Sequence, residues 1–175
     1  MPTAPKKAAK KAAGHHDPHK HARRTFEHLG RVQAIASLTQ EEHETVAFLT
    51  KSADIAFHAQ QYKASADLLR AAEHLSFASL NSSTTEQVSE ELEATITDEF
   101  ERLIDRAEEH AAHHSAPKAI QQLIARMTKQ AWAALKRGSY RAALEFARGV
   151  EALVHVDGLD DLALPASPTQ KRLQD

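Results

Sequence analysis

Hydrophobic residues recur every three or four positions through most of the chain, a spacing typical of helices that bury one face. The first such stretch runs from about residue 20 to 37 and carries Phe26, Leu29 and Val32. Further helices are predicted over about 39–58, 63–81, 83–114, 117–137 and 140–157. The pattern therefore predicts an all-α protein.

Capping residues mark several of the predicted helix ends. Thr39 and Glu42 form a capping-box pattern, which Ser83 and Glu86 repeat before the fourth stretch. Gly138 is the expected C-terminal cap of the fifth stretch. The fourth stretch is long and contains weak helix formers around Thr97, so the sequence leaves open whether 84–114 is one helix or two.

The second half of the chain resembles the first. Shifting the sequence by 78 residues lays 49–75 on 127–153 without a gap, and nine of the 27 positions are identical. The identities that are not alanine include Tyr62/Tyr140, Arg70/Arg148 and Glu73/Glu151. We therefore predict two related helix-turn-helix units, about 20–80 and 98–156, linked by 81–97. Because each has one apolar face, they should stack as a helical bundle or a short solenoid.

The two ends of the chain lack this periodicity. Proline, glycine, lysine and histidine dominate residues 1–19, whereas two prolines and a polar finish characterise 159–175. We expect both ends to be disordered or loose. The folded domain is predicted over 20–158, which is long enough to bury one core.

The net charge of −2 conceals a basic N-terminal segment. Residues 1–24 contain seven lysines and arginines against the single acid Asp17, so the remainder carries −8. Such an arm can contact polyanions, nucleic acid among them, or simply aid solubility. The candidate polyanion contacts are Lys6, Lys7, Lys10, Lys11, Arg23 and Arg24.

Composition excludes several classes of chemistry. The chain has no cysteine, which rules out disulfides, thiolate metal sites and a cysteine nucleophile. It has no apolar run long enough to span a membrane, no signal-peptide pattern, and no P-loop or dinucleotide-binding glycine motif. We expect a cytoplasmic protein with no membrane contact and no cofactor.

The turn between the last two predicted helices resembles that of tetratricopeptide (TPR) repeats. Residues 131–147 place a glycine and a tyrosine at the turn and alanines after it. The chain departs from that family in its 78-residue period and in lacking the closing proline. The resemblance implies a non-catalytic interaction module. Its aromatic anchors would be Tyr62, Tyr140 and Trp132.

The same turn and the residues after it also resemble the HEPN family of helical bundles, several of which are metal-independent ribonucleases. That family's motif is an arginine followed four to six residues later by a histidine, which Arg148 and His155 match. The resemblance implies that Arg148 stabilises charge on a phosphate and that His155 assists proton transfer. Gly149 departs from the polar residue usual after the arginine, and Arg70 and His74 are closer together than the motif requires.

Two histidine clusters are candidate metal sites. The first lies in the N-terminal segment and comprises His15, His16, His19 and His21. The second pairs residues four apart on a predicted helix and comprises Glu109, His110, His113 and His114. The alternatives are incidental metal binding by the segment and a solvated helix end.

These observations suggest three functions. The preferred one is a non-catalytic interaction or scaffold module that binds a protein partner or its own copy. The second is a HEPN-like protein that binds or cleaves RNA without a metal, and the third is metal binding through the histidine clusters. Only the second would make the protein an enzyme.

Overall fold

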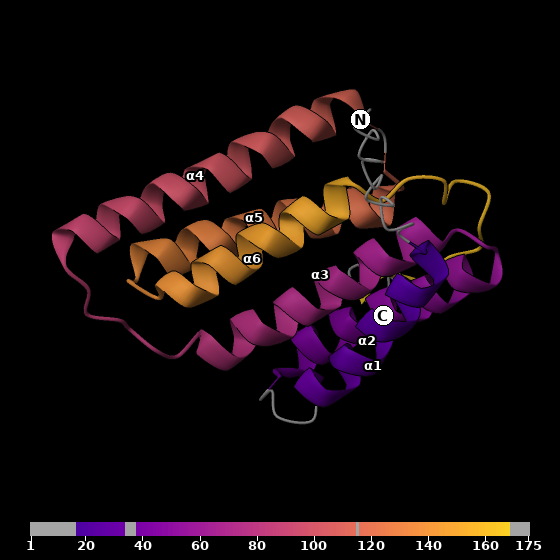
Figure 1. Ribbon diagram of the computed structural model, residues 1–175, viewed down its shortest axis with the longest axis horizontal. Helices are drawn as coiled ribbons and strands as arrows, with labels where there is room; N and C mark the ends of the chain where they lie inside the picture. The colour runs from indigo at the N-terminus through magenta and orange to yellow at the C-terminus, as the bar shows by residue number, and fades with distance from the viewer. Residues whose placement is uncertain (1–16, 34–37, 115, 169–175) are drawn as a thin grey trace, which may run out of the picture.

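The computed structural model describes residues 17–33, 38–114 and 116–168, and in these residues it contains six helices and no strand (Figure 1). The helices in chain order are α1 (Pro18–Gln33), α2 (Gln40–His58), α3 (Tyr62–Asn81), α4 (Glu90–His113), α5 (Lys118–Lys136) and α6 (Tyr140–Val154). The all-α prediction is confirmed. No helix of the described residues is both long and apolar enough to cross a membrane.

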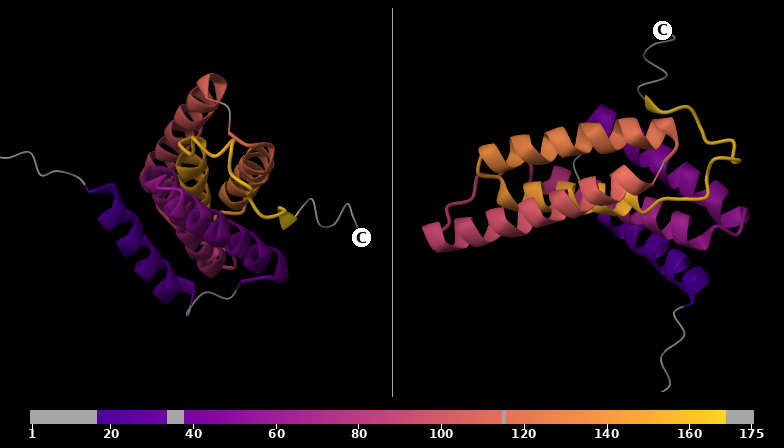
Figure 2. Two further views of the ribbon diagram at one scale, coloured as in Figure 1. Left: turned by 90° about the vertical axis from the view of Figure 1, so that its right-hand side faces the viewer. Right: turned by 90° about the horizontal axis from the view of Figure 1, so that it is seen from above.

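The helices form two groups of three that meet along α3 and α6. In the first group α3 packs against α1 and α2, and in the second α6 packs against α4 and α5. The most extensive contact in the molecule joins α3 to α6, which lie side by side at its centre (Figures 1 and 2). The core therefore runs through both groups as one hydrophobic cluster.

The two groups have matching helix bounds. Helices α2 and α5 begin 78 residues apart, at Gln40 and Lys118, and end 78 residues apart, at His58 and Lys136. Tyr62 and Tyr140 begin α3 and α6 at the same separation.

Two of the predicted caps lie where the sequence placed them. Thr39 accepts a hydrogen bond from the backbone N–H of Glu42, whose carboxylate accepts from the backbone N–H of Thr39, so the capping box is complete. Gly138 follows the last residue of α5 closely and has φ +71°, a left-handed conformation that glycine adopts without strain.

The predicted start of the fourth helix is wrong. Residues 82–89 are not helical, and α4 begins at Glu90 with Ser89 as its N-cap. The reason is tertiary: the backbone N–H of Glu86 donates to Gly138 O at 2.9 Å, and its carboxylate accepts from the backbone N–H of Arg141. These contacts hold the segment extended along the α5–α6 turn.

From Glu90 the helix α4 continues without a break to His113. Thr95 does not interrupt it, because its hydroxyl donates to the carbonyl of Glu91 within the helix. The region that the sequence left open is therefore one helix.

Small residues allow α3 and α6 to approach closely. Ala71, Ala72, Ala143 and Ala147 are fully buried. A Cβ added at Gly149 would lie 2.5 Å from Met127 Cε and 3.4 Å from His74 Cβ. A residue with any side chain at position 149 would thus meet α3 and α5, which explains why the sequence has glycine directly after Arg148.

The ends of the chain differ in part from their prediction. Helix α1 begins at Pro18, because proline suits a first helical turn, and residues 1–16 lie outside the described residues. At the other end, the loose segment expected from residue 159 packs on the body as far as 168. Leu159 is only 1% exposed and belongs to the core, with Leu162 and Leu164 packed against it. Burial of these aliphatic side chains outweighs the loop-forming prolines.

Candidate functional site: a polar cavity between α3, α4 and α6

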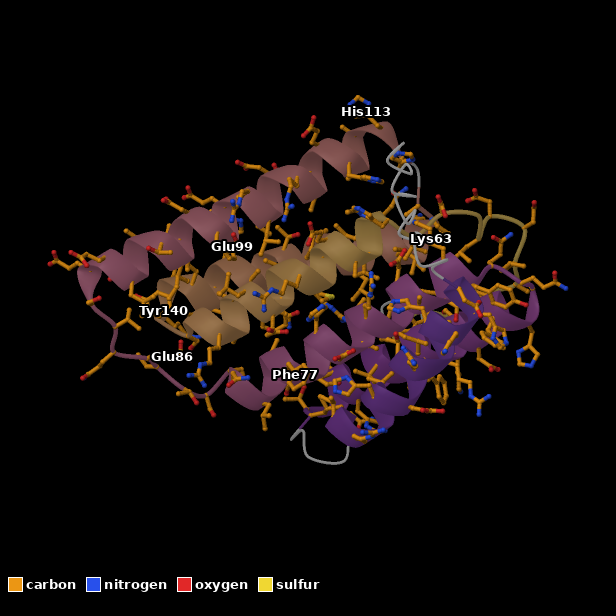
Figure 3. All side chains as sticks on the ribbon, in the orientation of Figure 1. Lys63, Phe77, Glu86, Glu99, His113 and Tyr140 are labelled. Carbon is orange, nitrogen blue, oxygen red and sulfur yellow. The ribbon has the colours of Figure 1, made fainter. Side chains whose placement is uncertain are left out.

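A polar cavity of about 370 Å³ lies where α3, α4 and α6 meet. Three arginines, three carboxylates and two histidines line it. The lining residues are Asp67, Arg70, His74, Glu99, Leu103, Arg106, Arg148, Glu151, Ala152 and His155. Figure 3 shows Glu99 on the side of α4 that faces α6, and Lys63 at the end of α3 near the last turn of α6.

The helical repeat explains why these side chains converge. Spacings of three and four residues put side chains on one helix face. The α3 wall has this spacing in Asp67, Arg70 and His74. The α6 wall has it in Arg148, Glu151 and His155. Because α3 packs against α6, the two polar faces border the same cavity.

Each arginine of the cavity lies beside a carboxylate. Arg70 is 3.5 Å from Asp67, and Arg148 donates to Glu145 at 2.8 Å. Arg106 of α4 reaches Glu151 of α6 at 3.0 Å. The guanidinium groups remain about half exposed, and exposed ion pairs of this kind contribute little to stability. The arginines are therefore held in position but remain available to an anionic ligand.

Asp67 is the most buried acid of the cavity, with 6% of the residue exposed. Its oxygens lie 3.3 Å from Lys63 Nζ and 3.5 Å from Arg70 Nη1. Burial raises the pKa of Asp67 even though Lys63, Arg70 and His155 act to lower it. The cavity thus contains a carboxylate whose ionised form is disfavoured.

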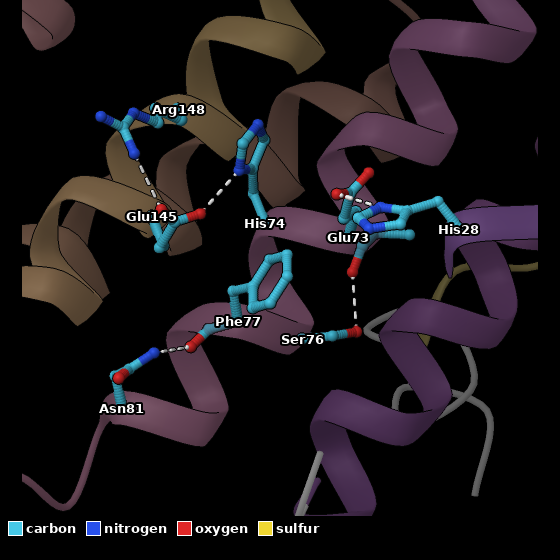
Figure 4. Close-up of polar contacts among 9 residues, drawn as sticks. His28, Glu73, His74, Ser76, Phe77, Asn81, Glu145 and Arg148 are labelled. Atoms are coloured by element: carbon cyan, nitrogen blue, oxygen red, sulfur yellow. Dashed lines mark hydrogen bonds and ion pairs between the residues drawn. The ribbon is translucent and has the colours of Figure 1, made fainter. Parts of the chain in front are cut away.

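A chain of three side chains connects α6 to α3 (Figure 4). Arg148 donates to one carboxylate oxygen of Glu145, and the other lies 2.7 Å from His74 Nδ1. Burial tends to raise the pKa of Glu145, but hydrogen bonds and charge from His74 and Arg148 outweigh it and the pKa is lowered. Glu145 is accordingly ionised at neutral pH.

His155 lies at the C-terminal end of α6, where Lys63 Nζ donates to its carbonyl oxygen at 2.7 Å. Its ring stacks on that of His110 with centroids 4.2 Å apart, and His110 stacks on His114 at the same distance. Within the described residues the buried Nδ1 of His155 has no hydrogen-bond partner. The ring is thus held by its faces rather than by its nitrogens.

The two residues named from the HEPN resemblance, Arg148 and His155, both line this cavity. So do Arg70 and His74 from the first half of the chain, whose spacing within the sequence is too short for the motif. The structure therefore brings two arginine–histidine pairs together from helices 78 residues apart in the repeat.

The three predicted aromatic anchors lie apart from the cavity and contribute to packing. Tyr140 is only 7% exposed, and a hydrogen bond to Glu93, together with burial, raises the pKa of its hydroxyl. Trp132 meets Phe100 edge-on, with ring centroids 4.7 Å apart. Tyr62 is partly buried against Phe57, at 5.2 Å.

The metal and polyanion candidates are dispersed. No group of three or more histidine, aspartate or glutamate side chains in residues 17–33, 38–114 and 116–168 could hold a metal ion. His19 packs on Phe57, and His21 Nε2 lies 2.7 Å from Arg70 Nη2. Arg23 and Arg24 are exposed. The remaining candidates, His15, His16, Lys6, Lys7, Lys10 and Lys11, lie outside the described residues.

Sequence reasoning missed two acids that shape the site, Asp67 and Glu145. Both stand three residues before an arginine, and they occupy equivalent positions of the 78-residue repeat. An acid followed by arginine on the same helix face, present in both halves, is the signal that identifies them.

Comparisons with protein-family models, with curated proteins and with solved structures give no significant match for this chain.

Proposed function

We propose that the cavity between α3, α4 and α6 binds the phosphodiester backbone of RNA and cleaves it without a metal ion. The observation that carries this proposal is the convergence of Arg70, His74, Arg148 and His155 on one cavity. Arginine matches the geometry of phosphate oxygens, and imidazole transfers protons near neutral pH.

In this proposal Arg148 stabilises charge on the phosphate and His155 takes part in proton transfer, as the resemblance to the HEPN family implies. Three arginines facing three carboxylates leave the cavity close to neutral. Selection of the ligand then depends on the positions of the guanidinium groups rather than on net charge. The basic segment before α1 would add unspecific affinity for the backbone.

The test is incubation of end-labelled RNA with the purified protein in chelator, followed by a denaturing gel. The natural protein should cleave, whereas Arg148→Ala and His155→Ala should lose about 100-fold or more in rate while remaining folded. Matched controls are Arg137→Ala and His58→Ala, which replace exposed residues of the same types away from the cavity. Intact RNA with the natural protein would refute the proposal.

We also propose that the two halves are copies of one three-helix unit. The equal 78-residue offsets of α2 with α5 and of α3 with α6 support this, as does the equivalent packing of α3 and α6 within their groups. On this basis the cavity lies between two equivalent helices.

A second candidate function is the docking of a protein partner or of a second copy. Its support is a separate groove of about 440 Å³ between α1, α2 and α3, with an apolar wall that includes Phe57 and Leu69. Phe26 at its edge is 50% exposed, an unusual position for a large apolar side chain. Tyr62 adjoins this groove through its contact with Phe57.

For self-association, Phe26→Ser is expected to convert a dimer into a monomer, because it removes the exposed apolar anchor without disturbing the core. Sedimentation equilibrium of the natural and variant proteins measures this. A monomeric natural protein at high concentration would exclude the groove as an interface between two copies.

A further inference from the structure

The contact between His74 and Glu145 has the geometry of a positioned acid–base group. The two side chains come from different helices, α3 and α6, and their Nδ1 and Oε2 atoms lie 2.7 Å apart. Both are largely buried, with 26% and 18% of the side chains exposed. Arg148 holds the other carboxylate oxygen at 2.8 Å, so Glu145 has little freedom to turn away (Figure 4).

The charge on Glu145 determines which nitrogen of His74 carries the proton. Because its pKa is lowered, Glu145 is ionised at neutral pH and can only accept hydrogen bonds. His74 Nδ1 must therefore donate. In the neutral imidazole the proton is then on Nδ1, and Nε2 carries a lone pair. This arrangement makes His74 a proton acceptor through Nε2.

We propose that His74 is a second catalytic residue of the cavity, acting as the general base through Nε2, and that Glu145 is its positioning residue. The inference rests on the proposed RNA cleavage and assigns the acid–base roles within it. Arg148 then has two roles, because it holds Glu145 and lies on the cavity wall where a phosphate would bind.

The proposed step conserves atoms and charge. His74 Nε2 takes the proton of the ribose 2′-hydroxyl while that oxygen forms a bond to phosphorus. The bond from phosphorus to the 5′ oxygen of the next nucleotide breaks, and this oxygen receives a proton from the imidazolium of His155. The products are a 2′,3′-cyclic phosphate and a 5′-hydroxyl, and water returns both histidines to their starting states.

The structure offers a matched control for this pair. His28 Nδ1 and Glu73 lie 2.7 Å apart across α1 and α3, the same contact chemistry, but neither residue lines the cavity. Glu73→Gln and Glu145→Gln therefore remove the same charge from similar histidine contacts. Only the second should affect catalysis.

The experiment measures kcat and KM for a defined RNA in chelator. His74→Gln is expected to lower kcat by roughly 100-fold. Glu145→Gln should lower kcat about tenfold or more with KM nearly unchanged, because it disturbs the base rather than the phosphate contacts. Glu73→Gln should leave both constants unchanged.

A second measurement does not depend on cleavage. Nuclear magnetic resonance of isotope-labelled histidine identifies the His74 ring as the signal missing from His74→Gln. We expect the Nδ1-protonated tautomer in the natural protein and a change of tautomer population in Glu145→Gln. A DNA dinucleotide, which lacks the 2′-hydroxyl and is not cleaved, should shift the His74 signal on binding.

The outcomes separate the two proposals. Cleavage by the natural protein that persists at full rate in His74→Gln and Glu145→Gln would overturn this inference and leave the proposed function standing. Absence of cleavage by the natural protein would overturn both. An Nε2-protonated His74 in the natural protein would overturn the general-base assignment whatever the rates.

Discussion

Asp67 combines nearly complete burial with two exposed cationic neighbours. Lys63 and Arg70 keep 61% and 46% of their side chains in solvent, so their attraction to the carboxylate is screened. The cost of removing a carboxylate from water is not screened in this way, which is why the pKa of Asp67 is raised. At neutral pH this residue therefore opposes folding.

Asp67→Asn is expected to raise Tm at pH 7. A carboxyl with a higher pKa in the folded than in the unfolded chain loses stability as pH rises through the folded value, and asparagine removes that loss. In a protein of this size each kcal/mol moves Tm by roughly 2–4 °C. Thermal melts at neutral pH and at about pH 3, where the carboxyl is protonated in both states, provide the measurement.

The difference in Tm between Asp67→Asn and the natural protein should shrink at the lower pH. A lower Tm for the variant at pH 7 would show instead that the contacts to Lys63 and Arg70 outweigh the cost of burial. That result would also make Asp67 a structural anchor of the α3 wall.

Helix ends bring together groups that no single helix would. The C-terminal ends of α4 and α6 stack His110 between His114 and His155. Desolvation lowers the pKa of His110, and the charges of His155, His114 and Lys63 lower it further. The terminal carbonyls of α4 would by themselves favour a cationic ring, so the neighbours outweigh the helix dipole.

His110→Phe is expected to reduce the loss of stability between pH 7 and pH 5. The folded chain binds a proton at His110 less tightly than the unfolded chain, whose value is about 6.5, so stability falls as pH falls through that value. Phenylalanine keeps a stacked ring without the proton. Tm measured across this pH range for His110→Phe and for the control His113→Phe tests it, and equal slopes would contradict it.

Element boundaries were predictable where they depend on neighbouring residues. Thr39 with Glu42, and Gly138 after α5, act within a few positions and were found from the sequence. The start of α4 was not, because Glu86 is held by the α5–α6 turn more than 50 residues away. Local capping patterns alone do not contain that contact.

At the scale of the whole molecule, periodicity predicted the helical class, and the repeat predicted which segments resemble one another. Neither predicted that α3 packs on α6, because that interface consists largely of alanine and one glycine, which give a weak hydrophobic signal. The cavity could not be foreseen for the same reason. Arg148 and His155 were found through a motif within one helix, whereas His74 and Glu145 depend on the pairing of two helices.

One chain supplies both walls of the cavity, with Arg70 on one side and Arg148 on the other. In a symmetric pair of identical subunits, every substitution would alter both walls at once. Here each wall can change alone, and they already differ: position 74 is histidine where its counterpart, position 152, is alanine. The two sides are thus free to specialise, one in removing a proton and the other in returning it.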